Sequence, residues 1–262
     1  MEQLERSAAR TESIVDPMYS KGAYFEDTQR HSADAQFKAD NFLKLFLRFA
    51  ARRSMTLRSF ADVGCGSGDI ARLLAATLRQ KGFDSIEFKA YDVSPHVAHI
   101  KHDGVEYING DFCASDETVD VATLFDVFEH VPDTIEFIKS VAQRCKVLGL
   151  HIPLDYSLNV AVRDLFRSKL DDPGHLVFMD TVTALNLLAL SGLRVVDYEY
   201  TFGFNVPSGR SSLRSKLAFP LRYLLARTSP WLLSKTLGGA SLIVIAVTPR
   251  GLRDMNIAGN GK

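Results

Sequence analysis

An aspartate, a glutamate and a histidine stand close together where acid–base chemistry could take place. Glu129 and His130 follow an apolar run that ends at Phe125, and Asp126 precedes the glutamate by one helical turn. If this stretch is helical, side chains at i, i+3 and i+4 project from one face. Such a set can act as a general base or contact a substrate, or it can be a structural pair that precedes the next helix. The residue types alone leave these alternatives open.

His175 is a second histidine that we expect near a ligand. It follows the turn at Pro173–Gly174, and loop residues at such positions commonly face a cleft. His151 differs, because it lies inside the apolar run Val147–Ile152, which is typical of a strand. We therefore predict that His151 is a buried histidine with satisfied hydrogen bonds.

A glycine-rich turn follows the short apolar run Ser59–Val63. Gly64, Gly66 and Gly68 have the spacing G-x-G-x-G, which differs from the G-x-G-x-x-G of dinucleotide binders. Glycine lets the backbone turn sharply and come within contact distance of a ligand, which a Cβ would block. An isolated glycine turn is often only a turn, but this one is followed by acidic residues at the ends of later strands.

Those acidic residues have the positions that a nucleoside would require. Asp92 closes the second expected strand, where a carboxylate can accept both hydroxyls of a ribose. Asp92 could instead be the N-cap of the next helix, but Ser94 fills that position better. After the third strand come Asp111 and Phe112, an acid and an aromatic ring that could meet the exocyclic amine and the face of an adenine.

Alternating strands and helices must position these residues. Apolar runs and helical spacing predict a helix over 33–53, strand 59–63, helix 69–80, strand 86–91, the start of a helix at 93–99, strands 105–108 and 119–125, helix 134–144, strand 147–152, helix 181–190, and strands 193–200 and 241–248. This alternation predicts an α/β fold with a doubly wound, mostly parallel, Rossmann-like sheet that helices cover on both faces.

Four stretches together resemble the motifs of class I S-adenosylmethionine (SAM)-dependent methyltransferases. They are Asp62–Gly68 (DVGCGSG), Tyr91–Pro95 (YDVSP), Gly110–Phe112 (GDF) and Asp120–Asp133 (DVATLFDVFEHVPD). The last is similar to the EHVPD signature of small-molecule methyltransferases, including those of ubiquinone biosynthesis. The motifs occur in order over about residues 33–200, and their combination is more specific than any one of them.

The resemblance implies SAM as cofactor, S-adenosylhomocysteine as product, and a seven-stranded sheet whose last strand runs antiparallel. It places the three glycines under SAM, Asp92 on the ribose, Asp111 and Phe112 at the adenine, and Phe125 beside the cofactor, while Asp62 would orient the glycine loop. The whole expected cofactor-binding set is Asp62, Gly64, Cys65, Gly66, Gly68, Asp92, Val93, Asp111, Phe112 and Phe125.

The candidate catalytic residues are Glu129, His130 and His175. Methyl transfer from a sulfonium mainly needs an acceptor held in position, but a protonated oxygen acceptor also needs a base or a metal. In the ubiquinone-pathway relatives, the matching acid-x-x-Glu-His set is associated with a divalent ion. Here the first acid is the shorter Asp126, so no metal is predicted; if one binds, Asp126, Glu129 and His130 are its candidate ligands.

The sequence therefore predicts a methyltransferase that acts on a small molecule, most simply at oxygen. Two alternatives stay open: a SAM-binding module without catalysis, and a reductase that uses the sheet for a nicotinamide cofactor. A nucleic-acid base methyltransferase is not expected, because Asp126–Glu129 stands where an Asn/Asp-Pro-Pro-Tyr/Phe stretch would be.

Charge and composition agree with that class. The 31 basic and 31 acidic residues among 262 cancel, so no overall positive field draws the chain to nucleic acid. Cys65, Cys113 and Cys145 form no C-x-x-C pair, so we expect neither a zinc cluster nor a disulfide framework. The first residues resemble no secretory signal and no apolar stretch is long enough for a spanning helix. We therefore expect a cytoplasmic protein, with its oligomeric state open.

One region departs from this even charge distribution. No acidic residue occurs between Glu199 and Asp254. Residues 201–240 are too many for a plain loop between two strands, so we predict a basic helical insertion there. The expected domains are an N-terminal extension over 1–32, a methyltransferase domain over 33–200 and 241–250, and a mobile tail over 251–262.

The insertion carries leucines at helical spacing. Helices are predicted over Leu213–Ala226 and Trp231–Leu237, and Pro220 and Pro230 are expected to break them into pieces. The leucines either pack on the sheet, or they belong to a lid for an anionic or amphipathic acceptor. Peripheral contact with an anionic membrane is a further alternative. Positive charge around the leucines comes from Arg210, Arg214, Lys216, Arg222 and Arg227.

Overall fold

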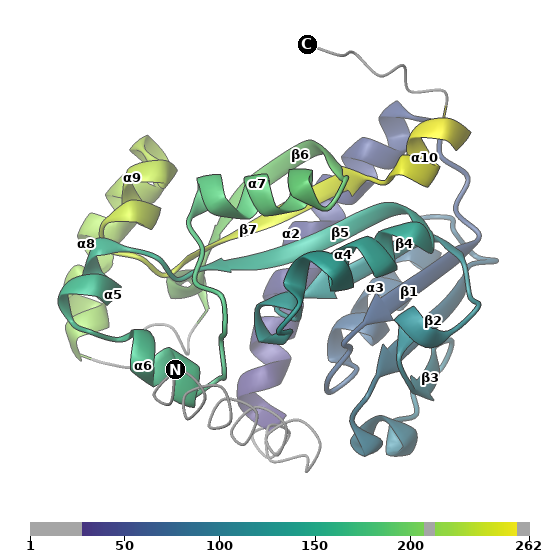
Figure 1. The fold of residues 1–262 in the computed structure, drawn as a ribbon, viewed down its shortest axis with the longest axis horizontal. Coiled ribbons are helices and arrows are strands. Elements are labelled where there is room, and N and C mark those ends of the chain that lie inside the picture. Colours follow the sequence, from purple (N-terminus) through teal and green to yellow (C-terminus); the bar gives the residue numbers. More distant parts are fainter. Residues whose placement is uncertain (1–27, 207–212, 256–262) are drawn as a thin grey trace, which may run out of the picture.

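The computed structural model describes residues 28–206 and 213–255 of the chain (Figure 1). Within these ranges the strands form one seven-stranded sheet of order β3-β2-β1-β4-β5-β7-β6. The strands are β1 (Ser59–Val63), β2 (Glu87–Asp92), β3 (Glu106–Asn109), β4 (Val119–Phe125), β5 (Cys145–Leu154), β6 (Arg194–Phe202) and β7 (Ala240–Val247). β1 to β5 are parallel, and β7 runs antiparallel to both β5 and β6. The predicted doubly wound sheet with an antiparallel last strand is confirmed.

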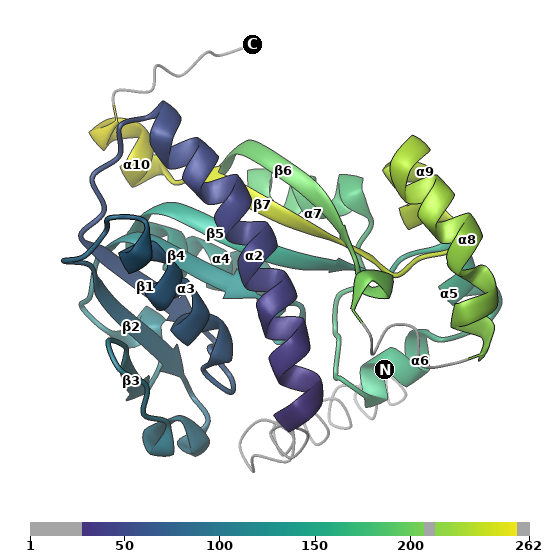
Figure 2. The ribbon, with the colours of Figure 1, turned by 180° about the vertical axis from the view of Figure 1, so that it is seen from behind.

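Helices cover both faces of the sheet, as the two views in Figures 1 and 2 show. α2 (Thr28–Arg52) and α3 (Asp69–Gln80) pack on one face, and α4 (Thr134–Gln143) and α7 (Thr181–Leu190) on the other. α2 crosses the sheet closely because β5 carries a glycine at the crossing. A Cβ on Gly149 would lie 2.3 Å from the ring of Phe42, which is fully buried.

Several boundaries differ from the sequence predictions: α2 begins at Thr28, inside the expected extension 1–32, and β6 continues to Phe202. Two other differences have identifiable reasons. β5 is longer than the predicted 147–152, because β7 pairs with it from Val147 to Leu154. The helix expected at 93–99 is a short 3₁₀ segment, Pro95–His99, whose N-cap is Ser94; the Ser94 hydroxyl accepts a hydrogen bond from His96 N at 3.4 Å. The assignment of the cap to Ser94 rather than to Asp92 is confirmed.

The segment between β5 and α7 and the segment before β7 each contain two helices. α5 (Leu158–Val162) and α6 (Phe166–Asp171) were not predicted, because each is too short to show a clear period. α8 (Leu213–Thr228) and α9 (Pro230–Lys235) lie together at one end of the sheet (Figure 1). Pro230 begins α9, as expected, and Ser229 caps it.

The prediction that Pro220 breaks its helix is wrong, because α8 continues through it. A proline inside a helix removes one hydrogen bond and crowds the preceding turn. The turns on either side of Pro220 are anchored separately: Phe219 packs against the core before it, and Leu225 and Ala226 pack after it. Tertiary packing therefore outweighs the local preference.

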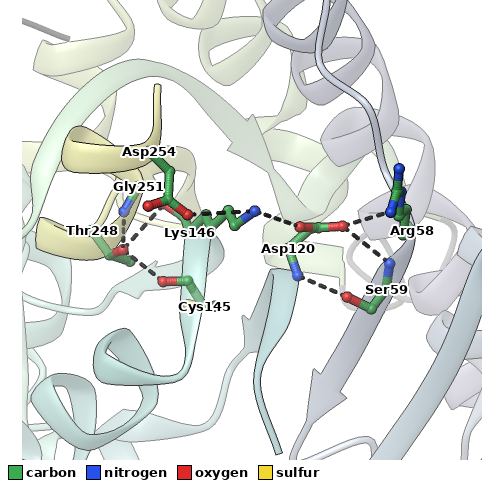
Figure 3. A network of polar contacts seen from close by, with 8 residues as sticks. All are labelled: Arg58, Ser59, Asp120, Cys145, Lys146, Thr248, Gly251 and Asp254. Carbon is green, nitrogen blue, oxygen red and sulfur yellow. Dashed lines mark hydrogen bonds and ion pairs between the residues drawn. The ribbon is translucent and has the colours of Figure 1, made fainter. Parts of the chain in front are cut away.

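A polar network ties the amino ends of the central strands together (Figure 3). Asp120 accepts hydrogen bonds from Arg58 N at 2.8 Å and Ser59 N at 3.3 Å, and its other oxygen lies 3.1 Å from Lys146 Nζ. The helix α10 (Pro249–Asp254) closes this edge, and its Asp254 also pairs with Lys146 at 3.5 Å. α10 covers part of the segment expected to be a tail; residues 256–262 lie outside the described ranges, as do residues 1–27 of the expected extension.

None of the helices over 28–206 and 213–255 combines the length and apolar character that crossing a membrane requires.

Candidate functional site

A cavity of about 350 Å³ opens at the carboxyl edge of the sheet, around the ends of β1, β2 and β4. β1 lies between β2 and β4, so this is the point where the order of strands reverses and where ligands bind in such sheets. Its wall includes most of the predicted cofactor-binding residues, namely Gly64, Cys65, Gly66, Asp92, Val93, Asp111, Phe112 and Phe125. It also includes Asp126 and His130, and Asp34, Ala35 and Lys38 from α2.

The glycine turn and Asp92 form one hydrogen-bonded unit. Gly64 has a φ of +74°, and a Cβ there would lie 2.6 Å from the Val127 side chain, so only glycine fits. Asp92 accepts hydrogen bonds from Gly66 N and Ser94 N, both at 2.8 Å. Each carboxylate oxygen can accept more than one hydrogen bond. Asp92 therefore holds the turn and retains acceptor capacity toward the cavity.

The aromatic and acidic residues that follow β3 and β4 make different contacts. Asp111 caps a short 3₁₀ turn by accepting from Cys113 N at 2.8 Å. Phe112 is 1% exposed and packs edge-on against Tyr91, with ring centroids 5.1 Å apart. Phe125 lies edge-on to Phe42 at 5.5 Å. These contacts hold both rings at the wall of the cavity.

Two of the predicted cofactor-binding residues, Asp62 and Gly68, do not line the cavity. Asp62 is buried and accepts a hydrogen bond from Thr123 Oγ1 at 2.7 Å. Burial raises the pKa of Asp62 to about 7. Gly68 has a φ of +77°, and a Cβ there would lie 2.6 Å from the Tyr107 ring. The prediction that Asp62 orients the glycine turn stays a prediction, because its side-chain hydrogen bond is to Thr123.

Asp126 joins a network of ion pairs with α2 and β5. Its carboxylate lies 2.5 Å from His151 Nδ1 and 2.5 Å from Lys38 Nζ, and Lys38 also pairs with Asp34. Burial would raise the pKa of Asp126, but His151 and Lys38 outweigh it and hold the pKa well below the ordinary value. His151 is buried and also lies 3.3 Å from Thr201 Oγ1, so its prediction as a satisfied core histidine is confirmed.

Glu129, His130 and His175 form a second cluster. Glu129 is 0% exposed, and neither of its carboxylate oxygens has a hydrogen-bond partner within the described ranges. His130 Nδ1 lies 3.0 Å from the carbonyl oxygen of Gly174, and His175 Nδ1 lies 2.5 Å from Asp155 Oδ2. The two imidazole rings are 4.8 Å apart. The three candidate catalytic residues are thus brought together.

The protonation states in this second cluster follow from burial. Burial, followed by the charge of Asp126, raises the pKa of Glu129 well above its ordinary value. Burial lowers the pKa of His130 to about 4, so this imidazole is neutral at neutral pH. Both shifts favour the uncharged forms.

The expectation that Asp126, Glu129 and His130 share one helical face is not met. Glu129 and His130 lie in a short 3₁₀ turn, Phe128–His130, while Asp126 precedes it with a φ of +53°. The carboxylate of Asp126 pairs with His151 and Lys38. The group that could share an ion is Glu129, His130 and His175, and not the set that contains Asp126.

Sequence reasoning missed three charged residues at this edge. Lys38 and Asp34 line the cavity from α2, and Asp155 anchors His175 while pairing with Lys169 at 2.6 Å. The i,i+4 spacing of Asp34 and Lys38 was a visible signal of a helical pair, but the approach of α2 to the cavity is a tertiary feature.

The insertion lies apart from this site. No described residue of α8 or α9 lines the cavity. Leu217, Leu221 and Leu224 are 75%, 51% and 58% exposed, so they do not pack on the sheet, whereas Leu225 does. The side chains of Leu213, Arg210 and Arg214 lie outside the described ranges.

Comparison with known proteins agrees with the architecture. A family model described as a methyltransferase domain matches residues 30–198. The plantazolicin methyltransferase BpumL, solved with a monoazolic desmethylPZN analogue and S-adenosylhomocysteine, superimposes with a TM-score of 0.57 at 13% identity, covering 94% of this chain and 98% of that one. A methyltransferase from Bacillus halodurans gives a TM-score of 0.53 at 18% identity, covering 79% and 98%.

A third structure, magnesium protoporphyrin IX methyltransferase from Synechocystis with bound S-adenosylhomocysteine, gives a TM-score of 0.51 at 12% identity, covering 82% and 84%. Identities this low show a shared fold. No protein with a curated function matches this chain in sequence.

The order of the strands and the glycine turn together identify an α/β protein whose ligand cavity lies where the strand order reverses. Because the family model matches well over half of the sequence, the chain belongs to the methyltransferase-domain family. Its fold is that of class I methyltransferases, and the cofactor of the family is SAM.

Proposed function

We propose that this chain transfers a methyl group from SAM to an oxygen of a small-molecule acceptor. The observation that carries the proposal is that the lining of one cavity includes two groups of residues with different chemistry. We call the glycine turn, Asp92 and Phe112 the first half of this lining, and His130 and the residues of α2 the second half. A cofactor and an acceptor can therefore meet in it.

The first half fits SAM. The glycine turn brings backbone within reach of the cofactor, because the positive φ of Gly64 and the contact with Val127 leave no room for a Cβ. Asp92 has the position and acceptor capacity to bind the ribose hydroxyls. When bound, SAM supplies an electrophilic methyl group on a sulfonium, and the protein needs only to hold an acceptor in line with it.

The second half fits a neutral oxygen acceptor. His130 lines the cavity and its Nδ1 faces the carbonyl oxygen of Gly174. The proton of the neutral ring is therefore on Nδ1 and the lone pair on Nε2, which can accept a hydrogen bond from an acceptor hydroxyl. We propose this contact as the way in which the acceptor oxygen is oriented.

The decisive experiment is a screen for methyl uptake with the purified chain. Phenols, quinols, sugars and carboxylates are incubated with methyl-labelled SAM, and calorimetry measures the affinities for SAM, S-adenosylhomocysteine and NAD(P)H. Tight binding of SAM together with labelled product supports the proposal. SAM binding without transfer to any class indicates a non-catalytic module, and binding of NAD(P)H in place of SAM indicates a reductase.

The role of His130 has a separate test. His130→Ala should lower kcat by roughly 10²-fold while SAM affinity stays nearly unchanged. His99, an exposed histidine away from the cavity, provides the matched control as His99→Ala. Full activity of His130→Ala would show that this histidine does not act on the acceptor.

For the basic insertion over 201–240, the exposure of its leucines favours contact with an anionic lipid surface. Leu217, Leu221 and Leu224 lie on one helical stripe at i, i+4 and i+7, and Trp231 at the start of α9 is 53% exposed. Exposed Lys216 and Arg227 add positive charge. Basic amphipathic helices bind anionic membranes in this way. A lid over an amphipathic acceptor is the alternative that the same features support.

Co-sedimentation with vesicles separates these two roles. The wild-type chain should bind vesicles containing anionic lipid at low salt, with less binding at high salt and little to neutral vesicles. The double variant Leu217→Ser, Leu221→Ser should lose this binding, whereas Leu190→Ser, at an exposed leucine of α7, should retain it. If no vesicle binds the wild type, the lid role is left for the insertion.

A further inference from the structure

Three potential ligand atoms converge beside the cavity. Glu129, His130 and His175 each contribute one such atom, and all three atoms lie within 4.8 Å of one another. The two segments that carry them are joined by a hydrogen bond from Leu176 N to the Glu129 carbonyl oxygen at 2.8 Å. We infer that this cluster binds one divalent first-row transition metal ion, with a carboxylate and two imidazoles as ligands.

The strongest observation is the unsatisfied carboxyl group of Glu129. Its side chain is completely buried, and no described residue donates a hydrogen bond to either oxygen. Burial of a carboxyl group without a partner is destabilising, and native proteins rarely retain such a group without a functional reason. A metal ion about 2.0–2.2 Å from a carboxylate oxygen supplies the missing interaction.

The two histidines have the surroundings that metal-bound histidines have. His175 Nδ1 lies against Asp155 Oδ2, and the second oxygen of Asp155 is held by Lys169 at 2.6 Å. His130 Nδ1 lies against the carbonyl oxygen of Gly174. An Nδ1 that faces an acceptor carries the proton, so the lone pair is on Nε2. A carboxylate or carbonyl behind the ring is the usual second layer around a metal-bound imidazole.

The donor atoms favour a transition metal over magnesium or calcium. Imidazole nitrogen is a preferred ligand of Zn²⁺, Fe²⁺ and Ni²⁺, whereas Mg²⁺ and Ca²⁺ select oxygen. Two imidazoles and one glutamate form the ligand set of several catalytic zinc sites, in which the fourth position is open. With bonds of about 2.1 Å, ligand atoms in a tetrahedral site lie roughly 3.4 Å apart. We therefore expect the three side chains to move inward when an ion binds.

The location gives the ion a role in the proposed reaction. His130 lines the cavity, so an ion bound to it would lie at the cavity wall with its open position toward an acceptor. An acceptor hydroxyl bound there would release its proton to water at a lower pH, leaving an oxygen nucleophile for the methyl group. With the ion bound, the Nε2 lone pair of His130 is a metal ligand, so the ion takes the place of the direct hydrogen bond between His130 and the acceptor hydroxyl. This role rests on the proposed function, whereas the binding of the ion does not.

Metal binding by the full chain tests the inference directly. After removal of any affinity tag and of bound metal with a chelator, calorimetry and metal analysis are carried out with Zn²⁺, Co²⁺ and Mg²⁺ separately. We expect one Zn²⁺ or Co²⁺ per chain, no comparable binding of Mg²⁺, and visible absorption bands from bound Co²⁺. Glu129→Gln and His175→Gln should each lower Zn²⁺ affinity by at least 10²-fold. Asp155→Asn, which alters only the positioning of His175, should lower it by roughly 10–100-fold.

His99→Gln is the matched control, because His99 is exposed and belongs neither to the cluster nor to the cavity wall, and it should bind the ion as the wild type does. S-adenosylhomocysteine affinity, measured on every variant without metal, reports an intact fold. If one ligand variant fails to fold, the other decides. Absence of stoichiometric Zn²⁺ and Co²⁺ binding to the wild type, or undiminished binding to the folded ligand variants, would overturn the inference. A chain that binds the metal but not SAM would contradict the proposed function and leave the metal site in place.

Discussion

The two edges of the sheet use acidic side chains in opposite ways. At the amino edge, both oxygens of Asp120 are engaged, by two backbone N–H groups and by Lys146 (Figure 3). At the carboxyl edge, Glu129 is buried and neither oxygen has a partner in the described chain. The first arrangement stabilises the fold, and the second leaves capacity for a ligand.

Asp126 shows that position at the carboxyl edge is not sufficient to mark a ligand group. It lies at the cavity wall, yet His151 and Lys38 compensate its charge. A buried polar group is a candidate ligand-binding group when its hydrogen bonds are unsatisfied, and not merely because it lies at the carboxyl edge. The following predictions test two statements. Residues at the amino edge should affect only the free energy of unfolding, whereas buried acidic residues at the carboxyl edge should serve ligand binding and lower the free energy of unfolding.

The largest expected effect concerns Asp62, which is buried in β1 directly before the glycine turn in sequence. Its pKa is about 7 in the folded chain and 3.8 when unfolded, so the stabilisation by its neutral form is complete below pH 3.8 and is lost as pH rises toward 7. Asp62→Asn stays neutral throughout. At pH 7.5 we expect the variant to be more stable than the wild type by roughly 4 kcal/mol, and by much less at pH 4.5.

Urea unfolding of both proteins without SAM, at a series of pH values, measures this difference. The exposed Asp84→Asn provides the control and should follow the wild-type profile. Parallel profiles for the wild type and Asp62→Asn would show that the carboxyl edge does not lower stability at this position.

The amino edge should respond to Gly251→Ala in stability alone. A Cβ at Gly251 would lie 2.0 Å from the backbone oxygen of Lys146, so α10 would have to move off the sheet. We expect the free energy of unfolding to fall by about 3 kcal/mol, with SAM affinity unchanged below the unfolding transition. Gly203→Ala is the control, because the nearest atom to its Cβ would be 3.9 Å away. A loss of SAM affinity in folded Gly251→Ala would contradict the separation of the two edges.

At the carboxyl edge, Asp92→Ala should lose SAM affinity, together with some stability, because Asp92 also accepts hydrogen bonds from Gly66 N and Ser94 N. Removing two charge-assisted hydrogen bonds to a ribose, each worth about 1.5–3 kcal/mol, should weaken SAM binding by an order of magnitude or more. Calorimetry measures this affinity, and thermal unfolding monitors the fold. Asp84→Ala should leave both unchanged. Unaltered SAM affinity in Asp92→Ala would remove Asp92 from the binding site.

The smallest effect is expected for Glu129→Leu in metal-free protein. A leucine of similar size removes an unsatisfied carboxyl group, so the free energy of unfolding should stay unchanged or rise by about 1 kcal/mol. Asp120→Asn, at the other edge, should lower it instead. Denaturation in the presence of a chelator compares the two. A clear loss of stability in Glu129→Leu would mean that Glu129 is a structural group after all.

Local patterns were sufficient for much of the fold. Apolar runs alternating with helical spacing predicted the mostly parallel sheet, because a sheet covered on both faces needs continuous apolar strands. The antiparallel last strand was implied by the resemblance to class I methyltransferases. The glycine turn and Asp92 were predicted to lie together, because parallel strands end at a common edge, and both line the cavity. Ser94 was recognised as a cap from its place before a proline.

The contacts between distant segments were decided by the tertiary structure. Asp126 pairs with residues of α2 and β5, and its left-handed backbone conformation places it outside the turn that carries Glu129. Asp155 meets His175 across a loop, and Pro220 stays inside α8 because packing on both sides compensates for it. Periodicity reports which face of an element is apolar, but not which element will cover it or which charges that element carries. The sequence by itself therefore determined the order of strands and helices and the residues of the glycine turn. The partners of each buried charge were determined by tertiary packing alone.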